Sequence, residues 1–539
     1  MGDIATEPTL SVPVLLRERA ARDPDGILIQ HVDGTQITNA GFHTAAIVWA
    51  DVFRSLGAKQ DDCIVTITDP IIEGYACWIG ICWAGCMEVS VNPELKGNLL
   101  VHAISDSKAR IVVASAKYLD LLTSVIARLE HVQTIISIDD PGARAGILRF
   151  SDLAASASPV EHFDPGLMSP YGVIYTSGTT GPSKGVIVPW GSLQYAVMDR
   201  LFHGDDEVYH DPAIYSPWPM FHSSGRMGLA FAAIRDARLV IRPRLSVSSF
   251  WDEVRAFGCT HVHLIGVANF LFVQPEQSND ADNPLRRVLM NPVIAEFREF
   301  EKRFGVVVST GWGMTEIGMP MAAVDPPNSI TCGQLSPLYD AKIVDKTGKP
   351  VPEGEVGHLY IRQKRPWLLL KGYLGRPEAD QESWSGEWFR TGDALRRDNQ
   401  GYYYFIDRIS DYLRVRGNNV SSVELEGEIR LHPDVDDVAA VAVRMQPASC
   451  QSSGRNVIAA TTEDEIKVLV IRRPGSTLSE AELHGFMKKS LPGYMVPRFI
   501  EFVGSLPRTP TGKIRKGAIR SDAGTSLVWD REIDAHMSN

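Results

Sequence analysis

The chain has 539 residues, several times the length of a typical domain, so it must divide into more than one folding unit. Hydrophobic residues make up 44% and charged residues 22%, a globular balance that excludes a disordered chain, a collagen and a coiled coil. The net charge of −11 argues against a duplex nucleic-acid partner, which needs a basic face.

Cysteine usage and hydropathy favour a cytoplasmic protein without a membrane span. The seven cysteines form no CxxC pair and are expected to be reduced and buried. The most apolar stretch, residues 75–87, is shorter than the ~20 residues that a span needs, and we expect it to form a core helix. The first residues show neither the basic nor the apolar region of a secretory signal.

A polar loop between two strand-like segments is the strongest local signal. Residues 175–185 read YTSGTTGPSKG and lie between the strand-like residues 172–174 and 186–188. Glycines let backbone N–H groups approach an anion, hydroxyls donate hydrogen bonds, and a lysine supplies a mobile cation. The pattern departs from a P-loop, because Ser183 and Gly185 replace two required residues and a strand follows. A phosphate-binding loop and a flexible polar hairpin both remain open on this segment alone.

The segment from about residue 238 to residue 309 alternates between strand and helix patterns. Residues 238–241 are β-rich, 250–257 are helix-like and 260–267 are strand-like. A second helical spacing across residues 294–304 precedes strand-like residues 306–309. This order predicts a mostly parallel sheet with helices on its faces.

The pattern changes near residue 330. Residues 342–345, 358–362 and 402–406 are short strands separated by turn clusters, which predicts a β-rich subdomain. A compact α+β pattern follows, with helices and strands expected at 423–431, 438–443, 466–471 and 479–490. We therefore place a domain boundary near Ser410.

The loop at 175–185, together with motifs farther along the chain, resembles the adenylate-forming superfamily of acyl-CoA ligases, luciferase and peptide-synthetase adenylation domains. The resemblance implies an α/β fold. A large N-terminal AMP-binding domain, residues 1–409, would contain layered α/β subdomains and a β-rich subdomain at about 330–409. A small mobile α+β domain, residues 410–539, would carry the catalytic lysine. In the loop, the resemblance implies phosphate binding by Thr176, Ser177, Gly178, Thr179, Thr180 and Lys184.

Residues 312–316, WGMTE, resemble the second core motif of that superfamily. The resemblance implies that Trp312 stacks on adenine, Thr315 contacts phosphate and Glu316 helps to hold Mg²⁺. Each role suits its side chain, since a π face matches a base and a hard carboxylate oxygen matches a hard cation. Tryptophan stands where tyrosine is usual, and it should keep the stacking.

Two further motifs imply contacts to the ribose. In residues 387–393, Asp393 matches the aspartate that accepts hydrogen bonds from both ribose hydroxyls. Arg408 matches an arginine that contacts ribose and phosphate.

The C-terminal part carries the remaining matches. Lys513, in residues 506–514, matches the lysine that reaches the substrate carboxylate and the α-phosphate, and it is the principal catalytic candidate. Gly417 matches the segment that lines the thiol side after the domain rotates. Ser410 stands at the hinge, where Asp or Lys is commoner.

The acid pocket is less well marked. In residues 219–222, His222 matches a loop that borders the acyl pocket, and we count it among the catalytic candidates. His261 and His263 alternate along a strand, which predicts packing and surface roles. Trp218, Phe221 and Met227 are further lining candidates; Arg226 is equally compatible with a solvated side chain.

Softer similarities indicate the crotonobetaine/carnitine-CoA ligase branch. Residues 289–293 replace the Gly-Gly-Ala-Pro stretch of many relatives, as in that branch, and residues 417–426 and 249–254 resemble it too. The substrate class remains open among carnitine-like, short-chain, medium-chain, aromatic and steroid-like acids.

These resemblances imply an ATP-dependent acyl-CoA ligase that uses ATP, Mg²⁺, coenzyme A and a carboxylic acid. One alternative is a stand-alone adenylation enzyme that loads a phosphopantetheinyl carrier protein. Another is a non-enzymatic nucleotide-binding protein, against which the presence of Lys184, Glu316, Asp393, Arg408 and Lys513 argues. A homodimer is the default expectation for the oligomeric state.

Overall fold

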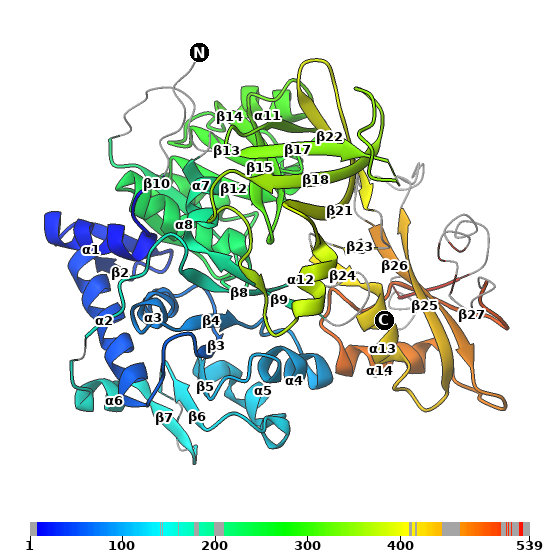
Figure 1. The fold of residues 1–539 in the computed structure, drawn as a ribbon, viewed down its shortest axis with the longest axis horizontal. Coiled ribbons are helices and arrows are strands. Elements are labelled where there is room, and N and C mark those ends of the chain that lie inside the picture. Colours follow the sequence, from blue (N-terminus) through cyan, green and yellow to red (C-terminus); the bar gives the residue numbers. More distant parts are fainter. Residues whose placement is uncertain are drawn as a thin grey trace. The chain divides into compact units, whose positions relative to one another are not determined.

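The computed structural model divides the chain into two compact units (Figure 1). Unit 1 comprises residues 1–93, 100–175 and 185–407, and unit 2 comprises residues 94–99, 176–184 and 408–539. Each unit is described by itself. The structure describes residues 8–140, 142, 144–159, 161–176, 183–198, 210–345, 347–408, 412–415, 418–444, 464–507, 514, 516, 519 and 528–531.

An eight-stranded sheet forms one layer of unit 1, in the order β19-β9-β8-β4-β3-β5-β6-β7. Strands β3 to β8 pair in parallel where their register is described, and β19 pairs with β9 antiparallel. The strands are β3 (Cys63–Ile67), β4 (Met87–Ser90), β5 (Ile111–Ala114), β6 (Thr134–Ser137), β7 (Ile147–Arg149), β8 (Pro170–Thr176), β9 (Lys184–Pro189) and β19 (Gly372–Tyr373).

A 14-stranded sheet forms a second layer, with the main order β17-β18-β21-β22-β16-β15-β14-β13-β12-β10-β11-β1-β2 and β20 paired to β21. Strands β1, β11, β10, β12, β13 and β14 are parallel, as the alternating pattern predicts. These strands are β1 (Ile27–His31), β2 (Gln36–Thr38), β10 (Ala213–Ser216), β11 (Arg238–Ile241), β12 (His261–Ile265), β13 (Arg287–Asn291) and β14 (Val307–Met314).

The β-rich segment after residue 330 continues this same sheet. The described antiparallel pairings begin before that segment, with the β14–β15 hairpin, and continue through it. The strands are β15 (Gly318–Val324), β16 (Thr331–Leu335), β17 (Tyr339–Val344), β18 (Gly357–Gln363), β20 (Trp384–Ser385), β21 (Trp388–Arg397) and β22 (Tyr402–Arg408).

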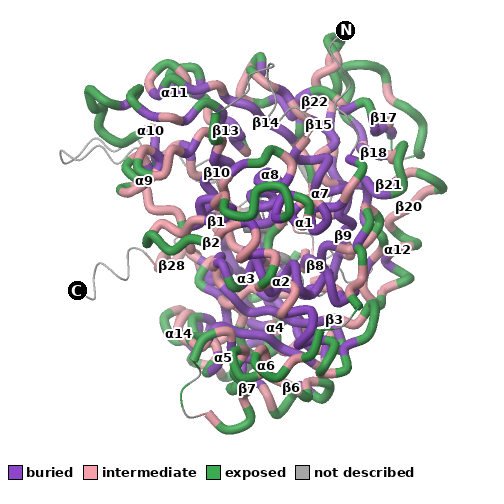
Figure 2. Tube along the Cα trace, turned by 90° about the vertical axis from the view of Figure 1, so that its left-hand side faces the viewer, coloured by how far each residue is buried: buried purple, intermediate pink, exposed green. Residues whose placement is uncertain are grey.

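Helices pack against both sheets, and one apolar core includes residues of both (Figure 2). Every residue of α3 except Glu73 is buried, and α7 and α8 are almost as fully enclosed. The described helices up to residue 383 are α1 (Val12–Arg22), α2 (Asn39–Ser55), α3 (Ile72–Trp83), α4 (Gly97–Ser105), α5 (Leu119–Thr123), α6 (Phe150–Ser156), α7 (Trp190–Met198), α8 (Ser223–Arg235), α9 (Phe250–Ala256), α10 (Ala268–Phe272), α11 (Phe297–Phe304) and α12 (Pro377–Ser383), with short 3₁₀ turns at Ala116–Tyr118 and Ile126–Arg128.

The apolar stretch at residues 75–87 is not a single helix, which corrects the sequence-based expectation. Helix α3 ends at Trp83, and Gly85 follows with φ of 77°. A positive φ suits glycine and reverses the chain. Residue 87 then begins β4, so one apolar run supplies a helix and a buried strand.

Unit 2 has the expected α+β character. Helix α14 begins with a capping box, in which Ser479 and Glu482 satisfy each other's backbone N–H groups. The elements are β23 (Tyr412–Val415), β24 (Asn418–Ser421), α13 (Ser422–Ile429), β25 (Val435–Arg444), β26 (Asp464–Arg472), α14 (Glu480–Ser490), β27 (Phe499–Phe502) and β28 (Trp529–Asp530). Strands β25 to β28 form a four-stranded sheet, and β23 and β24 form a hairpin.

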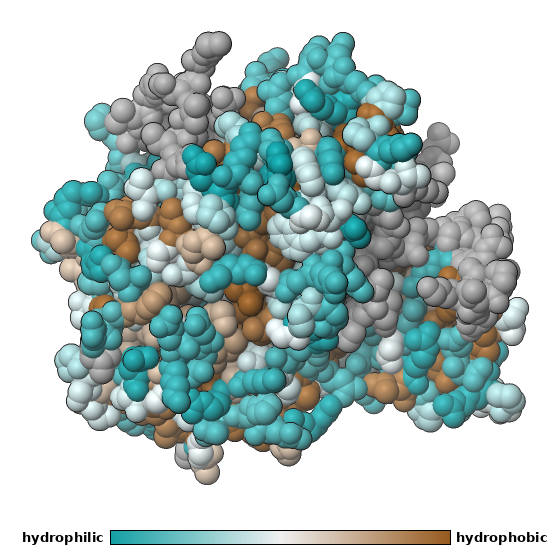
Figure 3. Space-filling model, viewed as in Figure 1, coloured by the Kyte–Doolittle hydropathy of each residue, from teal (hydrophilic) through white to brown (hydrophobic). Residues whose placement is uncertain are grey.

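Hydrophilic residues occupy most of the described surface on the face shown in Figure 3. Among the residues that the structure describes, none of the helices has the length and hydropathy to cross a membrane.

Candidate active site

The ends of the polar loop are placed on adjacent strands. Thr176 is the last residue of β8, and Lys184 is the first residue of β9. A side chain at Gly185 would bring its Cβ to 2.7 Å from Cγ1 of Val173, so glycine permits close packing of the two strands. Residues 177–182 lie outside the described structure, and with them the predicted contacts of Ser177, Gly178, Thr179 and Thr180.

The second motif lies in the tight connection between β14 and β15. Trp312 is half-buried opposite Met321, and a Cβ on Gly313 would meet the Gly318 carbonyl oxygen at 2.0 Å. Because only glycine fits there, the end of β14 and the start of β15 can approach each other closely. Thr315 and Glu316 lie in the turn itself.

Glu316 is buried and held by Tyr373 of β19. The Tyr373 hydroxyl donates to Oε1 of Glu316 across 3.3 Å, and the Glu316 carbonyl accepts from the Leu370 N–H at 2.7 Å. Burial and the nearby carboxylate raise the pKa of Tyr373, so its hydroxyl stays protonated and acts as a donor. Tyr373 is a contact that the motif did not reveal, because it lies 57 residues away in sequence.

The side chains around Glu316 are compatible with a Mg²⁺ site in which Glu316 is the single protein ligand. No group of three or more His, Cys, Asp or Glu side chains within the described ranges could hold a metal by itself. Mg²⁺ commonly takes one or two carboxylates and completes its shell with phosphate oxygens and water. One buried carboxylate beside a neutral phenol is compatible with that arrangement.

Asp393 lies in a constrained part of β21. It is 2% exposed, and its N–H donates to Oγ1 of Thr391 at 3.1 Å. The Thr391 hydroxyl in turn donates to the Leu359 carbonyl at 2.9 Å, and Gly392 between them has φ of 75°. These contacts fix the backbone that carries the carboxylate. Arg408 ends β22, and its side chain lies outside the described part.

His222 caps helix α8. Its Nδ1 accepts from the Ser224 N–H at 3.2 Å and lies 2.7 Å from the Ser224 hydroxyl. The ring is accessible to solvent, yet desolvation by the surrounding protein lowers its pKa, so the imidazole is neutral at pH 7. Because Nδ1 accepts, the hydrogen bonds assign the proton to Nε2, which can therefore act as a donor to a ligand.

His261 and His263 are both buried, so the surface role expected within this pair is wrong. His263 is only 7% exposed. Its Nε2 lies 3.2 Å from Oδ1 of Asn291 on the neighbouring strand β13. The Asn291 amide group donates to the Gly311 carbonyl, so its oxygen faces the histidine. Burial lowers the pKa of His263 to about 3, with a smaller contribution from His222.

These contacts explain what occupies the place of the missing Gly-Gly-Ala-Pro stretch. Asn291, the last residue of β13, joins β12 and β14 through its side chain. Trp218 donates from Nε1 to the His263 carbonyl at 2.7 Å, which brings the segment before His222 to the same region. Sequence reasoning missed His263 and Asn291 as a pair because they lie on different strands.

The other candidates for the acid pocket divide into two groups. Trp218 and Phe221 are partly accessible, whereas Arg226 and Met227 are buried. Arg226 is neither solvated nor free, since it pairs with Glu88 inside unit 1. The alternative of a solvated arginine is therefore wrong.

Three predicted residues of the C-terminal part lie outside the described ranges. These are the catalytic candidate Lys513, the thiol-side candidate Gly417 and the hinge candidate Ser410.

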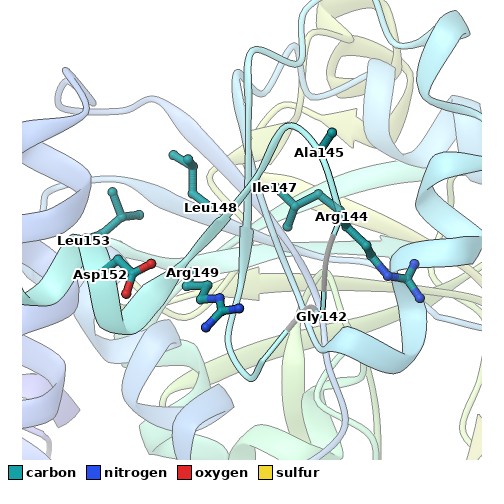
Figure 4. A pocket seen from close by; sticks show the side chains of 8 residues that line it. All are labelled: Gly142, Arg144, Ala145, Ile147, Leu148, Arg149, Asp152 and Leu153. Carbon is teal, nitrogen blue, oxygen red and sulfur yellow. The ribbon is translucent and has the colours of Figure 1, made fainter.

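A surface hollow of about 410 Å³ lies elsewhere, against β7 and α6 (Figure 4). Its two arginines are already paired, Arg144 with Asp120 at 2.5 Å and Arg149 with Asp140 at 3.2 Å. Of the predicted site residues that the structure describes, none lines it.

Comparison with known proteins confirms the resemblance. Residues 16–374 match the model of the AMP-binding enzyme family, and residues 456–513 match the AMP-binding enzyme C-terminal domain. The chain is 30% identical over 487 residues to the crotonobetaine/carnitine–CoA ligases of Salmonella enteritidis and Salmonella typhimurium. Each match covers 87% of this chain and 90% of the relative.

Solved structures share the fold at lower identity. The amide bond synthetase McbA from Marinactinospora thermotolerans superposes with a TM-score of 0.80 at 21% identity, covering 95% of this chain and 99% of that one. The o-succinylbenzoate CoA synthetase MenE from Bacillus subtilis superposes with a TM-score of 0.81 at 20% identity, covering 97% and 100%. This chain is a member of the AMP-binding enzyme family and carries that family's C-terminal domain.

Proposed function

We propose that the protein is an ATP-dependent acyl-CoA ligase. It activates a carboxylic acid as an acyl-adenylate with release of pyrophosphate, and then transfers the acyl group to the thiol of coenzyme A with release of AMP. Adenylation converts a poor leaving group into a good one, so the protein mainly positions reactants and stabilises developing charge. We place the enzyme in the cytoplasm, where free thiols persist.

One observation carries the proposal. An aromatic face, a hydroxyl and a buried carboxylate come within five residues, Trp312–Glu316, in a chain similar to CoA ligases over 487 residues. Adenine, phosphate and a hard cation require those three chemistries in close succession. A structural turn alone would not require a buried carboxylate at this point.

The remaining roles follow from the sequence motifs. Asp393 would accept hydrogen bonds from the ribose hydroxyls, and Arg408 would contact ribose and phosphate. Lys184 and the loop from Thr176 to Thr180 would bind the phosphates, and Thr315 would contact the α-phosphate. Lys513 would neutralise the charge that develops as the carboxylate oxygen attacks phosphorus.

Mg²⁺ would be held by Glu316 and would screen the phosphate charge when it is bound. This chain's own contribution is to orient the Glu316 carboxylate. The Tyr373 hydroxyl at 3.3 Å contributes to that orientation.

The second half-reaction would follow rotation of residues 410–539 about Ser410. Lys513 would then leave the site, and the segment at Gly417 would line the path of the thiol. A glycine there lets the pantetheine arm pass close to the backbone.

His222 would border the carboxylic acid as a neutral donor. Its Nε2–H is available because Nδ1 accepts the cap hydrogen bond of α8. A neutral donor suits a carbonyl or carboxylate oxygen and does not repel a cationic substrate. The similarity to crotonobetaine/carnitine–CoA ligases supports a small polar or trimethylammonium acid as the substrate class.

Detection of the acyl-CoA product tests the proposal. The protein is incubated with ATP, Mg²⁺, coenzyme A and a mixture of carboxylic acids, and new thioesters are identified by mass. We expect an acyl-CoA that requires all components. Acylation of a holo-carrier protein without acyl-CoA formation would instead favour the carrier-loading alternative.

A further inference from the structure

An ion pair lies fully inside unit 1. The Nη2 atom of Arg226, on α8, is 2.5 Å from Oε2 of Glu88, on β4, and their side chains are 0% and 2% exposed. Thr66 donates from its hydroxyl to the other carboxylate oxygen at 2.6 Å, and the Arg226 Cζ lies 4.3 Å from the centre of the Trp78 ring. Burying two charges is costly, and apolar residues of similar volume often stabilise a fold equally well.

The same arginine also contacts the turn that precedes α8. Its Nε donates to the Met220 carbonyl at 2.6 Å, two residues before His222. The turn is packed tightly against the helix, since a Cβ on Gly225 would lie 2.2 Å from the Pro219 carbonyl oxygen. His222, the turn and the first turn of α8 therefore form one closely packed piece held by Arg226.

The partner of Arg226 belongs to a strand that pairs with β8. Glu88 is in β4, which pairs in parallel with β8 through Val89 and Val173. A Cβ on Gly172 of β8 would lie 3.1 Å from the Glu88 carbonyl oxygen, so the two backbones are in close contact. Strand β8 ends at Thr176, where the predicted phosphate loop begins.

We propose that Arg226 is a positioning residue that, with Glu88, aligns the His222 turn with the strand that leads into the phosphate loop. The proposal rests on the proposed function, in which the first segment borders the acid and the second binds ATP phosphates. Attack of the carboxylate on phosphorus needs both reactants in register, and a misplacement of about 1 Å costs on the order of a hundredfold in rate.

The Arg226→Lys variant tests this role because lysine keeps the charge but has no rigid fork to reach two acceptors. Arg303→Lys is the matched control. Like Arg226, Arg303 pairs with a carboxylate, Asp280 at 2.6 Å, and donates to a carbonyl, that of Phe272 at 2.6 Å. It lies on α11, and not on α8. We expect Arg226→Lys to lower acid-dependent ATP–pyrophosphate exchange at least about tenfold and to raise the KM for the acid. The KM for ATP and thiolation of supplied acyl-adenylate should change little, and Arg303→Lys should match the wild type.

A purely structural role predicts a different pattern. Loss of stability alone would lower the rates of both half-reactions equally. The size of that loss would track the fall in the thermal midpoint of each variant. The double variant Glu88→Met with Arg226→Met removes both charges and the Met220 hydrogen bond. We expect it to keep the adenylation defect. Wild-type adenylation in a folded double variant would overturn the proposal.

Amide hydrogen exchange separates this proposal from the proposed function. In Arg226→Lys, and not in Arg303→Lys, peptides covering residues 218–225 should exchange faster than in the wild type. Unchanged exchange there would overturn the positioning role, even if the double variant failed to fold. A wild-type protein that activates no acid would instead contradict the proposed function, and the exchange result would still decide the role of Arg226.

Discussion

The hydroxyl of Tyr373 lies 3.3 Å from Oε1 of Glu316, and this contact joins the turn after β14 to strand β19 of the other sheet. The buried carboxylate is thereby oriented by a neutral donor. This relationship predicts unequal consequences for removing the two partners.

Glu316→Gln should lower acid-dependent pyrophosphate exchange by about 10²–10³ and raise the Mg²⁺ concentration needed for half-maximal rate, because the metal loses its charged ligand. Tyr373→Phe removes one neutral donor at a long 3.3 Å from the carboxylate, so its loss should stay within about tenfold. Asp280→Asn, which changes a buried carboxylate that pairs with Arg303 of α11, serves as the control. Equal effects at Glu316 and Tyr373 would contradict the ligand assignment.

His263 makes the stability of the fold depend on pH. The unfolded histidine takes up a proton below about pH 6.5, whereas the folded one does so near pH 3. Acidification therefore favours the unfolded chain by about 1.4 kcal/mol per pH unit below 6.5, or about 2 kcal/mol at pH 5. His263→Gln keeps an N–H donor toward Asn291 but does not titrate. Its thermal midpoint should fall less between pH 8 and pH 5 than that of the wild type, and an equal fall would contradict the assignment.

Lys513→Ala should separate the two half-reactions. Adenylation should fall by about 10²–10³, since the charge on the attacked phosphate is no longer neutralised. Thiolation of a supplied acyl-adenylate should survive, because the lysine has left the site by then. Lys488→Ala, an exposed lysine on α14, is the matched control. An equal loss in both steps would refute the role of Lys513.

Ser410→Pro should have the opposite effect. Proline fixes φ near −65° and would restrict rotation at the hinge. We expect acid-dependent pyrophosphate release to persist while thioester formation is lost. Ser410→Ala, which leaves φ unrestricted, should behave as the wild type. Normal overall turnover in the proline variant would rule out a hinge at this position.

Local patterns predicted much of the fold. The β-rich residues 238–241 form β11 with the expected bounds, and the helix expected at 479–490 forms α14, Glu480–Ser490. Such features depend on neighbours in sequence. The splitting of residues 75–87 into α3 and β4 was missed because periodicity alone cannot separate a buried helix from a buried strand.

The candidate site was predictable where its residues are contiguous. Residues 312–316 stand out as a motif, and the structure places them at the end of β14 and in the turn that follows it. The contacts of Glu316 with Tyr373 and of Arg226 with Glu88 were missed, because each joins elements far apart in sequence. A charged side chain read alone is usually solvated, and only tertiary packing reveals a buried pair.

Product release across a panel of acids tests the central claim most directly. The protein is supplied with ATP, Mg²⁺ and coenzyme A and with carnitine-like, short-chain, medium-chain, aromatic or steroid-side-chain acids, and AMP and pyrophosphate are measured together. The account predicts equal amounts of both products with one class of acid. Under multiple-turnover conditions, it predicts neither product when coenzyme A or the acid is omitted. Pyrophosphate without AMP release on adding coenzyme A would contradict coenzyme A as the acceptor, and silence with every class would contradict the ligase.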